Sequence, residues 1–283
     1  MRVLRSLLLG TLVCVLVGLS VTAGVAQAAP ALPNSMSAVG DSITRAYNTC
    51  SSAFADCPPN SWSAGTSATV NSHYSRVLAS NPLISGRSFN DAKSGAKMAD
   101  LNGQATTVNS RAVDYVTILM GGNDVCTSSA STMTSVATFS AQFQTAMTTL
   151  TAGSPNTRIL VSSVPDVYNL WSTLKNNGSA RFVWAIFGIC QSMLANPLST
   201  AQADVDRRAM VRQRNIDFNT QLGTICAAYA NCLFDGNAVF NTKFTSTDVS
   251  TRDYFHPSIN GQRRLACVTW GAGYWAPAIK EAC

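Results

Sequence analysis

Two short apolar runs near the middle of the chain constrain its fold most: YVTILM at residues 115–120 and RILVSSV at residues 158–164. Both consist almost entirely of apolar, β-forming residues, whereas a strand with one solvated face alternates apolar and polar positions. Strands that are buried on both faces are typical of parallel sheets covered by helices. These runs therefore predict the centre of a buried parallel sheet.

Short β-type runs alternate with longer segments of helical periodicity along the rest of the chain. Expected strands cover residues 36–39, 88–92, 115–120, 158–163 and 232–234, and expected helices cover residues 68–79, 97–108, 133–151, 203–230 and 259–270. A chain of 283 residues is long enough to bury one substantial core. The alternation predicts a single-domain, three-layer α/β/α sandwich with a mainly parallel central sheet.

The N-terminal segment has a different composition. Arg2 and Arg5 precede an uncharged apolar run over residues 7–25, and a small-x-small pattern, Ala26-Gln27-Ala28, follows it. These features are typical of a secretory signal peptide over residues 1–28. They predict an extracellular protein whose folded domain covers residues 29–283. An uncleaved membrane anchor is the alternative, because the apolar run is close to spanning length.

Cysteine usage agrees with export. Loss of the leader would remove Cys14 from the nine cysteines and leave an even set, which favours disulfides over metal ligands. Spacing does not fix the pairing. The most economical choice joins neighbours, as Cys50–Cys57, Cys126–Cys190, Cys226–Cys232 and Cys267–Cys283. No Cys-x-x-Cys motif occurs and the chain has only two histidines, so no zinc site is expected.

The net charge is mildly positive. Two of the formal +6 charges belong to leader arginines, which leaves about +4 for the mature chain. No basic cluster is interleaved with aromatic residues, so nucleic acid is not an expected partner. A mild positive charge favours transient contact with anionic lipid surfaces. The sequence gives no indication of the oligomeric state.

Polar segments that contain glycine follow three of the expected strands. Ser42 in GDSI (40–43) follows the first, Gly95 lies shortly after the second, and GGND (121–124) follows the third. Open parallel sheets bind ligands beyond the carboxyl ends of their strands, so we expect these segments to converge. A serine at such a position is also a common helix N-cap, and Gly-x-Ser recurs elsewhere in the chain. Its position alone therefore does not make Ser42 a nucleophile.

A serine hydroxyl needs an adjacent base to act as a nucleophile, and the two histidines are His73 and His256. His73 lies in a helical apolar stripe, which indicates a packing residue. His256 precedes Pro257, which places it in a loop entering the last expected helix, and Asp253 lies three residues earlier. A carboxylate at this spacing can orient the imidazole. Asp-x-x-His is also found as a simple surface pair.

Four segments together resemble, in their order, the motifs of the SGNH or GDSL hydrolase family: GDSI (40–43), Gly95 in AKSGAKM, GGND (121–124) and DYFHP (253–257). The leader and the cysteines are similar to those of secreted actinobacterial esterases and lipases. The resemblance implies that Ser42 is the nucleophile, His256 the general base and then acid, and Asp253 its orienting carboxylate. It also implies an oxyanion hole made by the backbone N–H groups of Ser42 and Gly95 and the side-chain amide of Asn123. No metal or organic cofactor is implied.

Other carboxylates also follow expected strands. Some members of the family orient the histidine with a backbone carbonyl instead of a carboxylate. Asp166 and Asp235, which follow strands, are alternatives to Asp253, although neither has a fixed spacing to the histidine. Asp41 and Asp124 are expected to brace loops rather than to react.

The predicted function is that of a secreted serine esterase or lipase, which acts on lipid or other small acyl esters through an acyl-enzyme. Trp184 and Phe187, in the apolar segment 167–198, are candidates for the wall of an acyl pocket, and a core-packing helix is the alternative. A carbohydrate acetyl esterase and an acyltransferase remain alternative activities on the same scaffold. A non-catalytic secreted binding protein is disfavoured, because every expected catalytic position is filled.

Overall fold

Parallel strands form one sheet, in the order β2-β1-β3-β4-β5, within the part of the chain that the structure describes. The structure is a computed structural model that describes residues 29–276 and residue 283. The strands are β1 (Met36–Gly40), β2 (Ser88–Asn90), β3 (Tyr115–Leu119), β4 (Arg158–Val161) and β5 (Cys232–Phe234). Each begins at the residue expected from the sequence and ends within two residues of the expected end.

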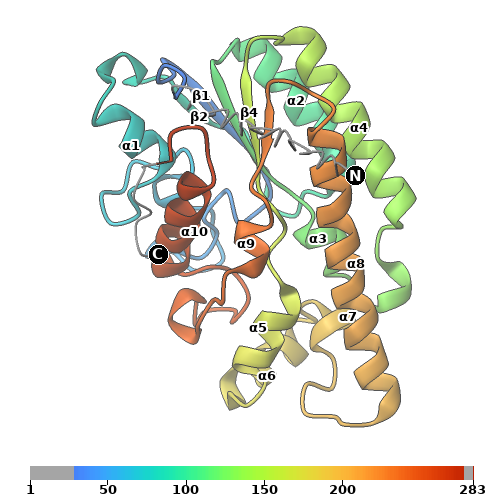
Figure 1. The fold of residues 1–283 in the computed structure, drawn as a ribbon. Helices are drawn as coiled ribbons and strands as arrows, with labels where there is room; N and C mark the ends of the chain where they lie inside the picture. The colour runs from blue at the N-terminus through green and yellow to red at the C-terminus, as the bar shows by residue number, and fades with distance from the viewer. Residues whose placement is uncertain (1–28, 277–282) are drawn as a thin grey trace, which may run out of the picture.

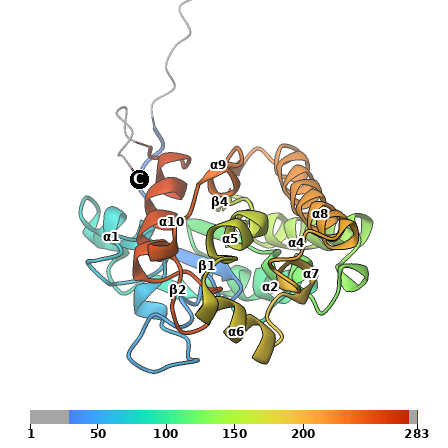
Figure 2. The same ribbon diagram turned by 90° about the horizontal axis from the view of Figure 1, so that it is seen from below.

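Helices cover both faces of this sheet, as the two views in Figures 1 and 2 show. The helices α2, α4 and α8 pack on one face, and α1 and α10 pack on the other. Their bounds are α1 (His73–Leu78), α2 (Leu101–Arg111), α3 (Gly122–Val125), α4 (Val136–Gly153), α5 (Val167–Leu174), α6 (Gly178–Ile186), α7 (Gln191–Leu194), α8 (Gln202–Cys226), α9 (Ala238–Asn241) and α10 (Ile259–Gly271). Single 3-10 turns are η1 (Pro58–Asn60), η2 (Pro82–Ile84), η3 (Met98–Asp100), η4 (Ala130–Thr132) and η5 (Ser246–Asp248). The predicted three-layer α/β/α sandwich is confirmed.

The central strand β3 shows why its sequence is almost continuously apolar. Val116 and Ile118 belong to the large apolar cluster completed by α2, α4 and α8. Tyr115 and Leu119 point to the opposite layer, where they pack with residues of α1 and α10. Because successive side chains of a strand point to opposite faces, a strand between two helical layers needs apolar residues at nearly every position.

Three helices, α1, α2 and α4, begin three to five residues later than the sequence pattern predicts. Helix α1 begins at His73, because the Ser72 side chain caps it by accepting the Ser75 N–H. The residue before the cap, Asn71, has a positive φ of 52° and cannot continue a right-handed helix. Helix α2 begins at Leu101, after the single turn η3. Local capping therefore sets boundaries that periodicity alone does not locate.

The apolar segment 167–198 forms three short helices rather than one, and Figure 1 shows α5 and α6 extending beyond the sheet. The side chain of Asn177 accepts the Ala180 N–H and starts α6 in a new direction. Gly188 and Cys190 have positive φ angles of 60° and 45°, which separate α6 from α7. Because α5 follows β4, the three helices lie at the carboxyl ends of the strands.

Disulfides join neighbouring cysteines in the described part of the chain: Cys50–Cys57, Cys126–Cys190, Cys226–Cys232 and Cys267–Cys283. The expected pairing is confirmed. The expected signal peptide, residues 1–28, lies outside the described residues. Among the residues that are described, we find no helix with the length and apolar character needed to cross a membrane.

Candidate active site

Ser42 lies immediately beyond the carboxyl end of β1, where the chain turns sharply. Gly40 permits this turn: its φ is +146°, and a Cβ there would lie 2.3 Å from the carbonyl oxygen of Leu119 on the neighbouring strand. The carboxylate of Asp41, rather than the hydroxyl of Ser42, accepts the backbone N–H of Ile43, at 2.9 Å. The Ser42 hydroxyl is therefore not used as a cap. It is 7% exposed and available for another partner.

That partner is His256, 214 residues further along the chain. The Nε2 atom of His256 lies 2.7 Å from the Oγ of Ser42, and its Nδ1 lies 2.6 Å from Oδ2 of Asp253. An ionised Asp253 accepts the proton of Nδ1, which leaves Nε2 as the acceptor for the serine hydroxyl. The structure thus brings the three residues implied by the resemblance into one hydrogen-bonded line.

Asp253 is held by more than the imidazole. Its Oδ1 accepts the backbone N–H groups of Phe255 and His256, and its Oδ2 also accepts a hydrogen bond from the side-chain amide of Asn48, at 2.5 Å. Burial raises the pKa of the Asp253 carboxyl, but the His256 hydrogen bond and charge and the two backbone bonds outweigh burial and leave this pKa below its usual value. The carboxylate is therefore ionised at neutral pH. Sequence reasoning missed Asn48, because a lone Asn five residues after the last GDSI motif position carries no signal.

The expected oxyanion-hole residues line one surface cavity of about 260 Å³ together with Ser42 and His256. Gly95 has a φ of +82°, in the region that favours glycine, and neither its N–H nor that of Ser42 donates a hydrogen bond to another described residue. The Asn123 side chain donates one amide hydrogen to the carbonyl of Ala96, at 2.9 Å, and keeps a second for another acceptor. Ser42, Gly95 and Asn123 thus lie around the same cavity.

Tyr47 also lines this cavity, although no sequence motif singles it out. Its ring lies against the imidazole of His256, with centroids 4.8 Å apart. Phe255 packs edge-on against the same imidazole from another direction, at 5.1 Å. The two rings restrict the orientation of His256 around its two hydrogen bonds.

The alternative carboxylates have other partners. Asp166 caps α5 by accepting the Tyr168 N–H, and it pairs with Arg212 at 3.1 Å. Asp235 accepts the Ser163 hydroxyl and the backbone N–H of Val239. Neither contacts His256. Asp253 is the carboxylate beside the imidazole.

Asp41 and Asp124 brace loops, as expected. Asp124 accepts the Met98 N–H and the Thr134 hydroxyl. Burial raises the pKa of Asp41 to about 6, and its Oδ2 has no hydrogen-bond partner among the described residues. Neither carboxylate bonds to the Ser42 hydroxyl.

The other histidine, His73, is completely buried at the start of α1, on the face of the sheet covered by α1 and α10. Its ring nitrogens bond to the hydroxyls of Tyr115, at 2.9 Å, and Thr269, at 2.8 Å. Burial, with a smaller contribution from the charge of Arg76, lowers the pKa of His73 to about 3. His73 is a neutral packing residue, as its sequence context indicated.

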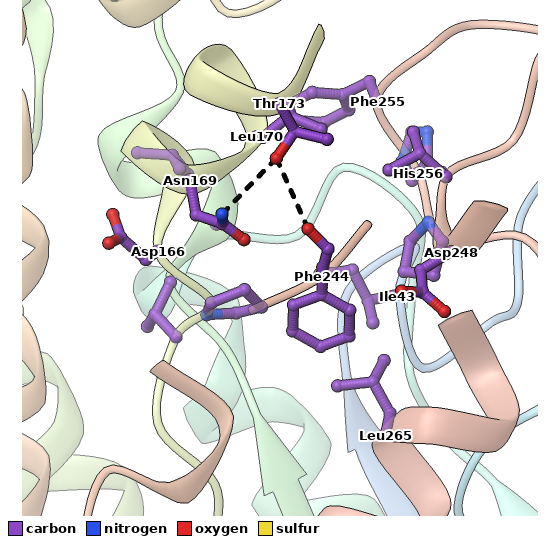
Figure 3. A pocket seen from close by; sticks show the side chains of 16 residues that line it. Ile43, Asp166, Asn169, Leu170, Thr173, Phe244, Asp248, Phe255, His256 and Leu265 are labelled. Carbon is purple, nitrogen blue, oxygen red and sulfur yellow. Dashed lines mark hydrogen bonds between the residues drawn. The ribbon is translucent and has the colours of Figure 1, made fainter. Parts of the chain in front are cut away.

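A second, apolar cavity opens beside His256 (Figure 3). Its walls come from the segment after β1, from the first residue of α3, from α5 and the chain leading into it, and from residues 244–265. The lining residues are Ile43, Gly122, Val164, Pro165, Asp166, Val167, Asn169, Leu170, Thr173, Phe244, Asp248, Val249, Phe255, His256, Pro257 and Leu265. Its volume of about 80 Å³ is room for a short apolar group.

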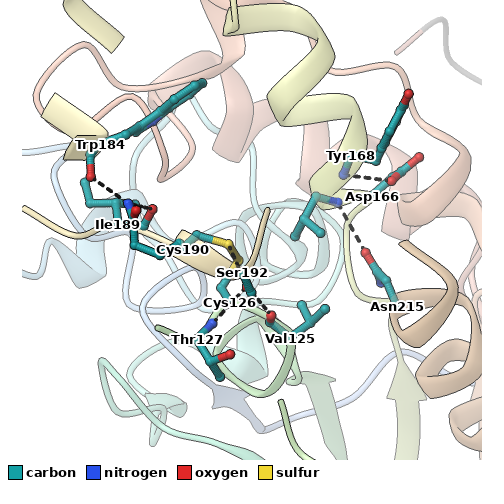
Figure 4. Close-up of a disulfide and its surroundings, with 12 residues drawn as sticks. Val125, Cys126, Thr127, Asp166, Tyr168, Trp184, Ile189, Cys190, Ser192 and Asn215 are labelled. Carbon is teal, nitrogen blue, oxygen red and sulfur yellow. Dashed lines mark hydrogen bonds between the residues drawn. A yellow bond between two sulfur atoms is a disulfide. The ribbon is translucent and has the colours of Figure 1, made fainter. Parts of the chain in front are cut away.

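Trp184 and Phe187, the residues expected to form an acyl pocket, do not line this cavity. Trp184 is 1% exposed, and its indole N–H bonds to the carbonyl of Tyr254 at 2.9 Å. Figure 4 shows Trp184 near the Cys126–Cys190 disulfide. Phe187 follows α6 and is 60% exposed. The structure thus places Trp184 in the core and Phe187 on the surface, and neither at this cavity. Residues of α5 take the place beside His256 instead.

The donor chemistry of the described residues offers no metal centre. No group of three or more His, Cys, Asp or Glu side chains gathers in a way that could hold a metal ion there. The cysteines near the site, Cys50, Cys57 and Cys126, are all in disulfides.

Comparisons with known proteins agree with this geometry. The profile of the GDSL-like lipase/acylhydrolase family matches residues 36–267. The fold is similar to that of an extracellular lipase from Streptomyces rimosus, at 18% identity, a TM-score of 0.50 and coverage of 84% of this chain and 99% of that chain. It is also similar to a GDSL-like lipase from Parabacteroides merdae, at 17% identity, a TM-score of 0.50 and coverage of 84% and 94%. A search of curated proteins found no match. Because the family profile spans most of the chain, this protein belongs to the GDSL-like lipase/acylhydrolase family and is a carboxylic ester hydrolase.

Proposed function

We propose that this chain is a secreted serine esterase that hydrolyses lipid or other acyl esters through a covalent acyl-enzyme, with Ser42, His256 and Asp253 as its catalytic triad. The observation that carries the proposal is the continuous hydrogen-bonded line from the Ser42 hydroxyl through His256 to Asp253. Secretion is supported by the disulfides and by the leader-like sequence of residues 1–28.

The first half of the reaction forms the acyl-enzyme. His256 Nε2 removes the proton from Ser42 Oγ as the oxygen attacks the ester carbonyl carbon, and the carbonyl electrons move onto its oxygen. As that oxyanion collapses, the bond to the alkoxy group breaks and His256 donates its proton to the leaving alcohol. The ionised Asp253 stabilises the imidazolium between these two transfers.

The second half repeats these steps with water. His256 takes a proton from water as its oxygen attacks the acyl carbon, and it then returns that proton to Ser42 Oγ as the carboxylic acid leaves. The N–H groups of Ser42 and Gly95 and the amide of Asn123 would stabilise the oxyanion in both halves. Loss of one such donor typically costs ~3 kcal/mol of transition-state stabilisation.

The cavity beside α5 favours an acyl group over an acetylated sugar as the feature that the enzyme recognises. It adjoins His256, and its lining is dominated by apolar side chains such as Val167, Leu170 and Phe244. An apolar chain gains free energy from leaving water for such a lining, whereas the hydroxyls of a sugar would lose hydrogen bonds there. Its small volume predicts a preference for short to medium chains.

The test is turnover of soluble nitrophenyl esters of increasing chain length by wild type and Ser42→Ala. We expect Ser42→Ala to lose at least ~1,000-fold in kcat, since it removes the nucleophile. Ser67→Ala is the matched control, because Ser67 lies in another Gly-x-Ser triplet and makes no side-chain bond to the catalytic residues. Retained turnover in Ser42→Ala would overturn the mechanism. Transfer of the acyl group to an added alcohol in preference to water would identify an acyltransferase.

A further inference from the structure

Four exposed apolar side chains lie together at the end of the molecule that carries the active site. They are Phe54, Phe182, Ile186 and Phe187, which are 54%, 66%, 63% and 60% exposed, and we call them the α6 patch. Large side chains this exposed are costly in water when they are contiguous, and such patches mark interaction surfaces.

The patch is contiguous because of how α6 is built. Phe182 and Ile186 are four residues apart and share the outer face of the helix, while Trp184 points inward. Phe187 follows directly, and its ring lies 5.8 Å from that of Phe54. In Figures 1 and 2, α6 lies at the periphery of the protein, away from the sheet.

Both halves of the patch are tied to the catalytic loop. Under α6, the indole of Trp184 bonds to the carbonyl of Tyr254, two residues before His256. On the other side, the Phe54 N–H donates to Oδ1 of Asn48, whose amide donates to Asp253. The guanidinium of Arg252 also donates to the carbonyls of Ser51 and Ser52 in the disulfide loop that carries Phe54. The patch therefore borders the active site.

The charges on the stretch that forms α5, α6 and α7 are of one sign. No Asp or Glu occurs between Val167 and Ala203, the stretch that forms α5, α6 and α7, whereas Lys175 and Arg181 both lie within it. Both side chains are partly exposed. The acidic residue nearest to Phe54 in the sequence, Asp56, is paired with Arg45 at 2.9 Å. Exposed aromatic side chains on a stretch that carries cations and no carboxylates match an interface of acyl chains and anionic headgroups.

We propose that the α6 patch docks the enzyme onto an anionic phospholipid surface, with its outer side chains at the level of the acyl chains and Lys175 and Arg181 at the headgroups. This proposal deepens the proposed function. Binding to the surface does not itself require ester hydrolysis. Only the use of docking rests on the proposed function, because the active site of the bound enzyme then opens toward an interface where acyl esters are concentrated. A second copy of the chain would bury the same apolar groups, but it would bring these cations against each other.

The test measures binding to vesicles in the Ser42→Ala background, which prevents turnover of lipid. Vesicles of phosphatidylcholine alone are compared with vesicles that also contain phosphatidylglycerol. We expect Ile186→Ser/Phe187→Ser to weaken binding to both, by roughly tenfold for phosphatidylglycerol vesicles. We expect Arg181→Gln to weaken binding to phosphatidylglycerol vesicles selectively, by roughly fivefold.

Leu83→Ser is the matched control. Leu83 is 68% exposed, but it lies in η2, before β2 and so at the amino-terminal edge of the sheet. We expect this variant to bind vesicles like its parent. Equal vesicle binding by the parent and the patch variant would overturn the proposal. The proposal would also fail if the parent does not bind vesicles but forms a concentration-dependent dimer that the patch substitutions abolish.

Turnover of a soluble short-chain ester separates this proposal from the proposed function. In the active enzyme, which keeps Ser42, Ile186→Ser/Phe187→Ser should keep the wild-type kcat/KM on that ester. This result also shows that the variant folds. Vesicle binding by a wild-type protein that hydrolyses no ester would refute the proposed function and leave the docking surface standing. Ester hydrolysis without any vesicle binding would refute only the docking surface.

Discussion

Asn48 and Asp253 are 205 residues apart in the sequence, yet the side-chain amide of one donates a 2.5 Å hydrogen bond to the carboxylate of the other. Asn48 also accepts the Phe54 N–H, so a single buried side chain connects the carboxylate next to His256 with the Cys50–Cys57 loop. Asn48 touches no reacting atom. It is a positioning residue for Asp253.

We predict that Asn48→Gly lowers kcat by about tenfold and leaves KM almost unchanged, because loss of a buried hydrogen bond costs ~1–3 kcal/mol and would loosen Asp253. Glycine is the suitable replacement. Asn48 has a φ of +66°, and a replacement that keeps a Cβ, such as alanine, would add backbone strain. Steady-state kinetics on a soluble ester measure the effect, with exposed Asn260→Ala as the control. A fall in thermal stability with unchanged kcat would make Asn48 purely structural.

Asn123→Ala should reduce kcat by ~100- to 1,000-fold with a small change in KM, because an oxyanion donor acts mainly in the transition state. The Asn123 amide also holds the Ala96 carbonyl, so the melting temperature must be measured in parallel. A variant that keeps its stability and loses kcat supports the oxyanion role. A variant that keeps kcat excludes it.

Leu170→Phe should fill part of the cavity beside His256 and shift the chain-length preference. We expect kcat/KM to fall by ~10-fold or more for the longest ester that wild type accepts, and to change little for acetate, because only the longer chain needs the cavity. Phe187→Ser is the comparison, since Phe187 lies outside this cavity and should leave both values unchanged on soluble esters. Equal losses on long and short esters in Leu170→Phe would exclude the cavity as the acyl site.

His73 should make the fold sensitive to mild acid. Its pKa is lowered from 6.5 to about 3 in the folded protein, so below pH 6.5 the unfolded state binds the extra proton and the folded state does not. The free energy of unfolding must therefore fall as the pH drops from 6.5 toward 3, by up to ~2 kcal/mol at pH 5.

The measurement is urea denaturation of wild type and His73→Gln between pH 4 and pH 8. The variant should be less stable at pH 8, because it disturbs the hydrogen bonds to Tyr115 and Thr269. Its stability should also depend less on pH below 6.5. Identical pH profiles would show that His73 does not titrate as its burial requires.

Much of the framework could be predicted because its physical causes are local. Short β-type runs located each strand, and the order of the four motifs placed Ser42, Gly95, Asn123 and His256 at strand ends or in a loop before the last helix. Parallel topology then requires the segments after β1 and β3 to meet at one edge of the sheet. The structure brings Ser42 and His256 within hydrogen-bond distance.

The cavity beside His256 could not be predicted in the same way. Its walls come from four separate stretches of chain, and apolar residues such as Ile43 and Leu265 look the same in a sequence whether they fill a core or line a hollow. The burial of Trp184 could not be predicted for a related reason. Its indole bonds to the carbonyl of Tyr254, 70 residues further along the chain, and such a distant contact has no pattern in the sequence.

The disulfides have a consequence for how the chain matures. No pair crosses or encloses another, and three of the four span only 6, 7 and 16 positions. A polypeptide that emerges amino-terminus first therefore exposes each correct thiol partner before any competing later one. Each disulfide can therefore form while the chain is still emerging. A non-native disulfide would form only if a cysteine did not react with the first free cysteine available to it.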